Sequence, residues 1–131
     1  MIAFQIGGEN SEFIRVSVTR VSRHELFSTD VEVAVGHFRG SYRADFESYA
    51  FSEFHKQLAI LNKTVSGSAV FTSREGQLEL TLKCDDLGHI HVSGEAMDLA
   101  GTGNRLLFEL GIDQTHIPKI LNSLKSTLES I

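Results

Sequence analysis

Apolar and polar side chains alternate along much of the chain, and this pattern predicts β-strands. The clearest example is residues 77–83, in which leucines at positions 78, 80 and 82 are separated by polar residues. Strict alternation places one face of a strand against a core and the opposite face in water. The same pattern predicts further strands at residues 2–6, 13–21, 31–35, 69–71, 90–96 and 105–110. The chain is therefore expected to contain about seven strands.

The apolar pattern changes phase after residue 35. Valines alternate up to that point, but the next apolar side chain is Phe38, and Gly36 lies between them. A phase change beside glycine is typical of a β-bulge or a sharp bend, so one is expected here. The segment before this strand, residues 22–30, is polar and irregular, and it is expected to be a loop held down by Leu26 and Phe27.

Two segments repeat apolar residues every three or four positions, which predicts amphipathic helices. The first follows Ser48, a potential N-cap, and ends at residues 65–67; the second follows Asp113 and Thr115, either of which can accept a bond from a free backbone N–H. Pro118 falls in the first turn of the second helix, where its missing N–H costs little. The two apolar stripes are Phe51, Phe54, Leu58 and Leu61, and Ile117, Ile120, Leu121, Leu124, Leu128 and Ile131.

The order and spacing of these elements indicate the fold class. Short links between consecutive strands imply antiparallel pairing, and one-sided strands need the cover that two amphipathic helices supply. A chain of 131 residues is expected to form one domain. We therefore predict, over residues 1–131, an α+β two-layer sandwich. It would have a curled antiparallel sheet of about seven strands, with both helices on one face.

Residues 98–118 carry the strongest local signals, combining a glycine-rich turn, a strand and a helix start. The turn lacks the third glycine of a dinucleotide-binding loop and is followed by a strand, so it does not predict a nucleotide site. Its polar residues have structural roles available in turn formation and helix capping. The residues assigned to this structural motif are Asp98, Gly101, Gly103, Asn104, Asp113, Gln114, Thr115 and Pro118.

Charge narrows the choice of partners. The net charge is −5, the pI is about 5.6, and the basic residues are scattered singly. Direct nucleic-acid binding is disfavoured because it draws most of its affinity from clustered basic side chains. An acidic surface suits a basic protein partner, although it suits plain solubility equally well. No apolar run is long enough for a membrane span, and the N-terminus does not resemble a secretory signal. A single cysteine, Cys84, favours a reducing compartment, so a cytoplasmic protein is expected.

The residues do not point to catalysis. Cys84 is expected on the polar side at a strand end, and a G-x-S-x-G nucleophile elbow is absent. His89, His91 and Glu95 leave one face of a strand and are a potential zinc or iron site, or simply part of a solvated sheet face. We favour the solvated face, and we expect no enzyme activity, no cofactor and no metal.

The chain resembles the WapI family of immunity proteins. The likeness is strongest over residues 98–118, which read D-x-x-G-x-G-N-x-L-x-F-x-L-x-I-D-Q-T-x-I-P, and it extends back through GHIHVSG at 88–94. More ordinary patterns at 58–71 and 31–46 continue it, so that it covers about residues 30–128. The resemblance implies a small cytosolic protein that binds and blocks a cognate toxin domain. In the family's best-known setting, contact-dependent inhibition, that toxin is a nuclease.

If the resemblance holds, a basic toxin is expected to meet acidic and adjacent groups on the polar side of the predicted sheet and in nearby loops. Two alternatives remain open: a structural or homodimeric module, and a small metal- or ligand-binding domain using His89 and His91. The residues predicted to contact the toxin are Glu25, Phe27, Asp30, Glu79, Asp85, Asp86, His89, His91, Glu95 and Glu109.

Overall fold

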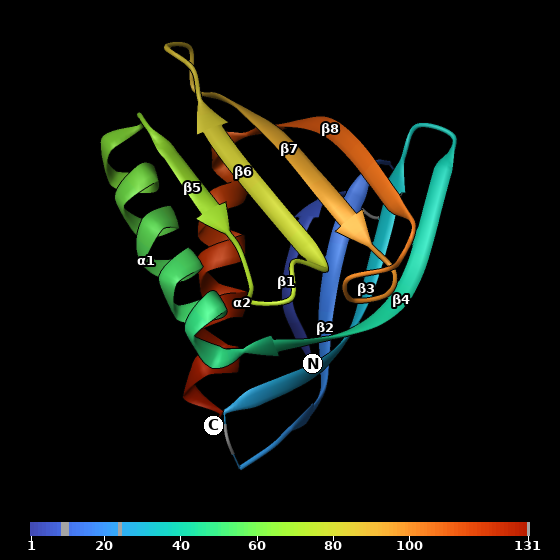
Figure 1. Ribbon diagram of the computed structural model, residues 1–131. Helices are drawn as coiled ribbons and strands as arrows, with labels where there is room; N and C mark the ends of the chain where they lie inside the picture. Colours follow the sequence, from blue (N-terminus) through green and yellow to red (C-terminus); the bar gives the residue numbers. More distant parts are fainter. Residues whose placement is uncertain (9–10, 24, 131) are drawn as a thin grey trace.

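The computed structural model describes residues 1–8, 11–23 and 25–130 (Figure 1). These residues form two successive units, each with four antiparallel strands followed by an α-helix. The first unit contains β1 (Ile2–Gly7), β2 (Phe13–Val21), β3 (Leu26–Val35), β4 (Phe38–Glu47) and α1 (Ser48–Thr64). The second contains β5 (Ser68–Phe71), β6 (Leu78–Cys84), β7 (His89–Met97), β8 (Arg105–Asp113), a 3₁₀ turn (Gln114–His116) and α2 (Ile117–Glu129).

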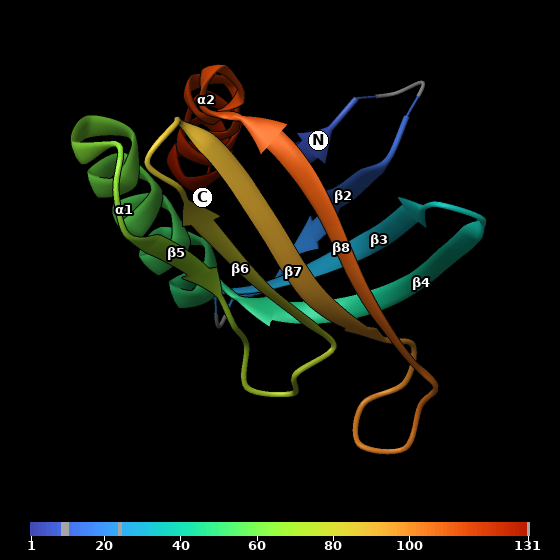
Figure 2. The same cartoon turned by 90° about the horizontal axis from the view of Figure 1, so that it is seen from above.

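The strands form two sheets, ordered β1-β2-β3-β4 and β5-β6-β7-β8, with both helices along one side of the pair (Figure 2). The helices pack against each other; α1 lies beside β5 and α2 beside β1. This confirms the predicted α+β class with antiparallel pairing and two amphipathic helices. The predicted strand number is corrected: the described residues contain eight strands, divided between two sheets that do not close into a barrel.

The eighth strand comes from the region where the apolar pattern changes phase. Val35 pairs with Phe38, so the chain reverses direction there in a hairpin. The predicted bulge or bend within a single strand is therefore wrong. Gly36 has a φ of 56°, which a glycine adopts at little cost. The change of phase therefore marks a new antiparallel strand.

The predicted loop at residues 22–30 is also corrected, because β3 begins at Leu26. Phe27 and Thr29 continue the inward phase of the following valines, and both are buried. The Thr29 hydroxyl donates a 2.7 Å hydrogen bond to the Ala44 carbonyl, which makes its burial acceptable. Because Thr29 is polar, the alternation of apolar residues was not recognised in the first half of this strand.

A cluster of phenylalanines joins the two units. Phe71 of β5 packs against Phe4 of β1, Phe46 of β4, and Phe51 and Phe54 of α1, with ring centroids 5.2–5.6 Å apart. These rings belong to one core cluster that includes residues from both sheets and both helices. Thus neither unit buries its apolar face alone. Cys84, predicted on the polar side, is buried in this cluster because it continues the inward phase of the β6 leucines.

The helix boundaries agree largely with the sequence pattern. The Asp113 carboxylate accepts a 3.1 Å bond from the Thr115 N–H, and Pro118 lies in the first turn of α2. Ser48, in contrast, is the first residue of α1 and not its cap; Glu47 occupies the cap position without a side-chain bond. The expected last member of the α2 stripe, Ile131, lies outside the described residues.

The turn at residues 98–104 is built as predicted. The Asp98 carboxylate accepts a 2.8 Å bond from the Asn104 N–H, and the Asn104 carbonyl accepts one from the Asp98 N–H. The Gly103 N–H donates to the Leu99 carbonyl, which folds the loop tightly across itself. Asp98 and Asn104 therefore both take part in the hydrogen bonds that close this turn.

We expect Gly103→Ala to lower the free energy of unfolding by about 1–3 kcal/mol. A Cβ at this position would lie 2.3 Å from the Leu99 nitrogen and 2.4 Å from the Asp98 carboxylate, so the loop would have to open. Gly111→Ala is the matched control, because a Cβ at Gly111 meets nothing within 4 Å. Urea denaturation measures both variants. Equal losses in the two would show that the tight turn does not matter.

Candidate partner-binding face

The outward side of the second sheet gathers most of the polar residues singled out by sequence. Glu79 lies directly opposite Glu95, and His91 lies on the same side of β7 as Glu95. Glu109 reaches this side from the neighbouring strand β8. We call this surface the acidic face. It comprises Glu79, Lys83, Asp85, Asp86, His89, His91, Glu95, Arg105, Leu107 and Glu109.

Cross-strand ion pairs link some of these groups without neutralising the surface. His91 Nε2 lies 3.2 Å from Glu109 Oε1, and Arg105 Nη1 lies 3.2 Å from Glu95 Oε1. Such solvent-exposed pairs contribute little to stability, so a partner can displace them at low cost. Glu79 forms no ion pair within the described residues, and like charges on opposed strand positions repel. Carboxylates exceed basic groups across the face, which consequently carries negative charge.

The turn between β6 and β7 extends this face with two aspartates. Asp85 Oδ1 accepts bonds from the backbone N–H groups of Leu87, at 2.8 Å, and His89, at 3.0 Å. These bonds, led by that from Leu87, lower the pKa of the Asp85 carboxyl below its ordinary value. The group is therefore ionised at any pH near neutrality. Asp86 beside it is exposed, so the turn presents two negative charges at the end of the sheet.

The two histidines do not converge on a common ligand. His91 pairs with Glu109, whereas His89 Nδ1 lies 3.6 Å from Asp85 Oδ2. In the part of the chain that the structure describes, no three His, Cys, Asp or Glu side chains are grouped to hold a metal ion. His89 and His91 are thus each paired with a different carboxylate on the exposed side of the sheet.

Three predicted contact residues lie elsewhere. Phe27 is 0% exposed and packs against Phe51 in the core, so the prediction that it touches a partner is wrong. Asp30 lies on the other sheet, where its carboxylate is 3.6 Å from Arg43. Glu25 lies in the turn between β2 and β3 and accepts a bond from the Ser48 hydroxyl. The structure therefore does not bring these three residues onto the acidic face.

Leu107 is a member of the acidic face that the sequence analysis did not single out. It lies opposite Glu95 in register and is 75% exposed. The signal was present in the alternation of β8, because Leu107 shares the outward phase with Arg105 and Glu109. An exposed leucine among charged groups adds apolar area to this face, and a docked partner would remove that area from water.

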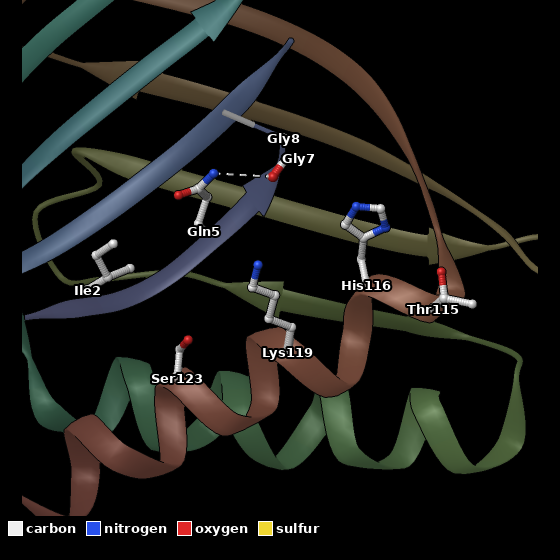
Figure 3. A pocket seen from close by; sticks show the side chains of 8 residues that line it. All are labelled: Ile2, Gln5, Gly7, Gly8, Thr115, His116, Lys119 and Ser123. Carbon is white, nitrogen blue, oxygen red and sulfur yellow. Dashed lines mark hydrogen bonds between the residues drawn. The ribbon is translucent and has the colours of Figure 1, made fainter. Parts of the chain in front are cut away.

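A separate concavity lies between β1 and α2 (Figure 3). This cavity of about 430 Å³ is lined by Gln5 of β1 and by Thr115, His116, Lys119 and Ser123 from the other end of the chain. A neighbouring cavity of about 530 Å³ shares His116 with it. Sequence reasoning missed both because their walls come from opposite ends of the chain.

None of the helices in the described residues is long and apolar enough to cross a membrane.

Two solved structures show a similar fold. The MRP1/MRP2 proteins of Trypanosoma brucei match with a TM-score of 0.53 and 11% identity, over 97% of this chain and 83% of theirs. A chain from the CdiA-CT/CdiI toxin and immunity complex of Enterobacter cloacae matches with a TM-score of 0.50 and 10% identity, over 85% of this chain and 97% of that one. No curated protein sequence matches this chain.

The fold is an open, two-sheet α+β architecture, and the outward side of its second sheet carries the acidic face. The family follows from a comparison of the whole sequence. The chain belongs to the immunity protein WapI-like family, whose model matches residues 5–131. This confirms the resemblance read from the motif at residues 98–118 and extends it almost to the N-terminus.

Proposed function

We propose that this protein is a cytoplasmic immunity protein that binds a cognate toxin domain through the acidic face and blocks it by occupying its working surface. Family membership carries the proposal, and the similarity to a chain from a toxin and immunity complex supports it. The protein acts by binding and does not transform a substrate. Binding alone can neutralise a toxin, provided that the complex covers the surface the toxin uses.

Charge on the acidic face favours a basic, nuclease-type toxin. An enzyme that cuts nucleic acid must attract phosphates, and a surface that attracts phosphates also attracts clustered carboxylates. Electrostatic complementarity of this kind raises the association rate more than the affinity. Leu107 adds an exposed apolar side chain on the edge strand β8, which a docked partner would cover.

Co-expression tests the function itself. Where a toxin gene adjoins the gene of this protein, its toxin domain is expressed alone and together with this protein, and bacterial growth is recorded. We expect growth arrest in the first case and growth in the second, with the two proteins recovered as a complex. Arrest in both cases would overturn the immunity proposal. If this protein forms a homodimer and does not bind the toxin, the result would favour a homodimeric structural module.

Charge reversal tests the surface. We expect Glu79, Glu95 and Glu109, all replaced by lysine, to slow association with the toxin at low salt by about tenfold or more. Association rates at increasing salt provide the measurement, because screening should reduce the difference. The matched control reverses three carboxylates outside the acidic face, Asp45, Glu53 and Glu129, and leaves the total charge change the same. Equal slowing in both triple variants would mean that only net charge matters and that the acidic face is not the docking surface.

A further inference from the structure

The two helices meet their neighbouring strands in different ways. On the α1 side, the Gln57 side chain reaches across to β5 and accepts a 2.8 Å hydrogen bond from the Val70 N–H. A backbone group at the outer edge of β5 is thereby satisfied by the helix beside it. This bond closes the seam between α1 and β5.

The repeated architecture identifies the equivalent position on α2. The buried positions of the two helices have the same spacing, which pairs Phe51, Phe54, Leu58 and Leu61 with Ile117, Ile120, Leu124 and Thr127. This alignment puts Ser123 where the first unit has Gln57, and Lys119 where it has Glu53. Serine is too short to reach across as Gln57 does. The second seam is therefore left open at the position where the first is closed.

The open part of the α2–β1 seam is the cavity of about 430 Å³, lined by Ser123 and Lys119 (Figure 3). The seam narrows at its other end, where Thr127 Oγ1 lies 3.5 Å from the Ile2 carbonyl oxygen. Gln5 forms part of the wall, and its amide is held by the Arg15 Nε donor at 2.9 Å and by its own bond to the Gly7 carbonyl. The cavity thus has one fixed polar wall and one helical wall.

The helical wall brings positive and hydrogen-bonding groups to this cavity. The Lys119 amine and the His116 ring extend from α2 and the preceding turn into the space below β1 (Figure 3). Lys119 forms no ion pair within residues 1–8, 11–23 and 25–130. Thr115 and Ser123 add hydroxyl donors to the same cavity. On a protein of net charge −5, this concavity offers a cation and several donors together.

We propose that the α2–β1 cavity binds a small organic anion, whose carboxylate or phosphate group contacts Lys119 and His116. Charge-assisted hydrogen bonds from an ammonium group and neighbouring hydroxyls are the chemistry that recognises such groups. The absence of a Gln57 equivalent leaves the room that the ligand occupies. The residues that line this cavity include none of the acidic face, and the inference does not depend on the proposed toxin binding.

Titration with citrate and with inorganic phosphate, each followed by amide NMR spectra, tests the site. We expect millimolar binding with shifts confined to residues 5–8 and 115–123, and the tighter of the two probes identifies carboxylate or phosphate as the preferred group. Lys119→Met should weaken binding by about tenfold or more, as loss of a charge-assisted bond predicts. The matched control is Lys125→Met on the same helix, where the lysine pairs with Glu129 and does not line the cavity.

Two substitutions at Ser123 separate the cavity from the charge. Ser123→Gln places in α2 the side chain that closes the other seam, so it should abolish binding of both anions while Lys119 remains. Ser123→Ala leaves the cavity open and should retain binding within about threefold, the loss expected for one half-buried hydroxyl. No shift with either probe at tens of millimolar, or equal binding by all four variants, would overturn the proposal. A spectrum of well-dispersed amides in each variant confirms that the fold is intact.

Discussion

Replacing Gln77 with leucine is expected to lower the free energy of unfolding by about 2–4 kcal/mol, although the side-chain volume hardly changes. Gln77 is only 5% exposed and lies between the two sheets. Its amide Nε2 is 3.4 Å from the Arg43 carbonyl on β4 and 3.3 Å from the Met97 carbonyl on β7. Leucine offers no N–H, so the buried Met97 carbonyl and the partly buried Arg43 carbonyl would both lose this donor.

The backbone of Gln77 adds to the same junction. Its carbonyl accepts a 2.6 Å bond from the Tyr42 hydroxyl and a 3.0 Å bond from the Met97 N–H. Burial raises the pKa of Tyr42, so the phenol stays protonated and remains a donor well into the alkaline range. Tyr42→Phe should cost less than Gln77→Leu, about 1 kcal/mol, because Met97 still donates to the same carbonyl.

Glu79→Leu is the matched control for Gln77→Leu, since Glu79 is two residues away and exposed. It should change stability by no more than about 0.5 kcal/mol. Chemical denaturation followed by both fluorescence of the tyrosines and far-UV circular dichroism measures all three variants. A Gln77→Leu protein as stable as the Glu79→Leu protein would show that the junction between the sheets does not depend on this amide.

Gln77 also shows where sequence patterns reach their limit. It shares the alternation phase of Glu79 and was therefore assigned to the polar side, yet it precedes β6 and turns inward. Thr29 is a second polar residue on an inward face, and its hydroxyl donates to the Ala44 carbonyl. The apolar periodicity shows which side chains are apolar. It does not show whether a buried hydrogen-bond partner is available to a polar side chain. Buried polar residues with distant partners are consequently the positions that it misplaces.

Parts of the candidate sites were predictable for a simple physical reason. His91 and Glu95 lie on one strand, and alternation alone places them on one face. Adding Glu79 and Glu109 required only that consecutive strands pair, which the short connections indicated. The α2–β1 cavity could not be predicted from the sequence, because no local sequence pattern indicates that residues 2–8 and 115–123 lie side by side. Phe27 was expected in a loop and was predicted as a toxin contact, but it lies on β3 with its side chain buried in the core.

The second large effect is expected for Phe71→Ala, which should lower the free energy of unfolding by about 3–5 kcal/mol. Phe71 is 0% exposed, and its ring meets Phe4 and Phe46 of the first sheet as well as two rings of α1. Alanine would leave a cavity where the two units join. The rigid neighbours around it cannot fill this space, because both backbone layers are fixed by their own hydrogen bonds.

Phe38→Ala removes the same atoms from a side chain that is 63% exposed, and it should cost less than about 1 kcal/mol. The comparison isolates burial from residue type. Because Phe71 belongs to the second unit and most of its partners to the first, the loss should appear as one cooperative transition shifted to lower denaturant. Two separate transitions would instead mean that each four-stranded unit with its helix folds by itself, and that the shared phenylalanine cluster does not couple them.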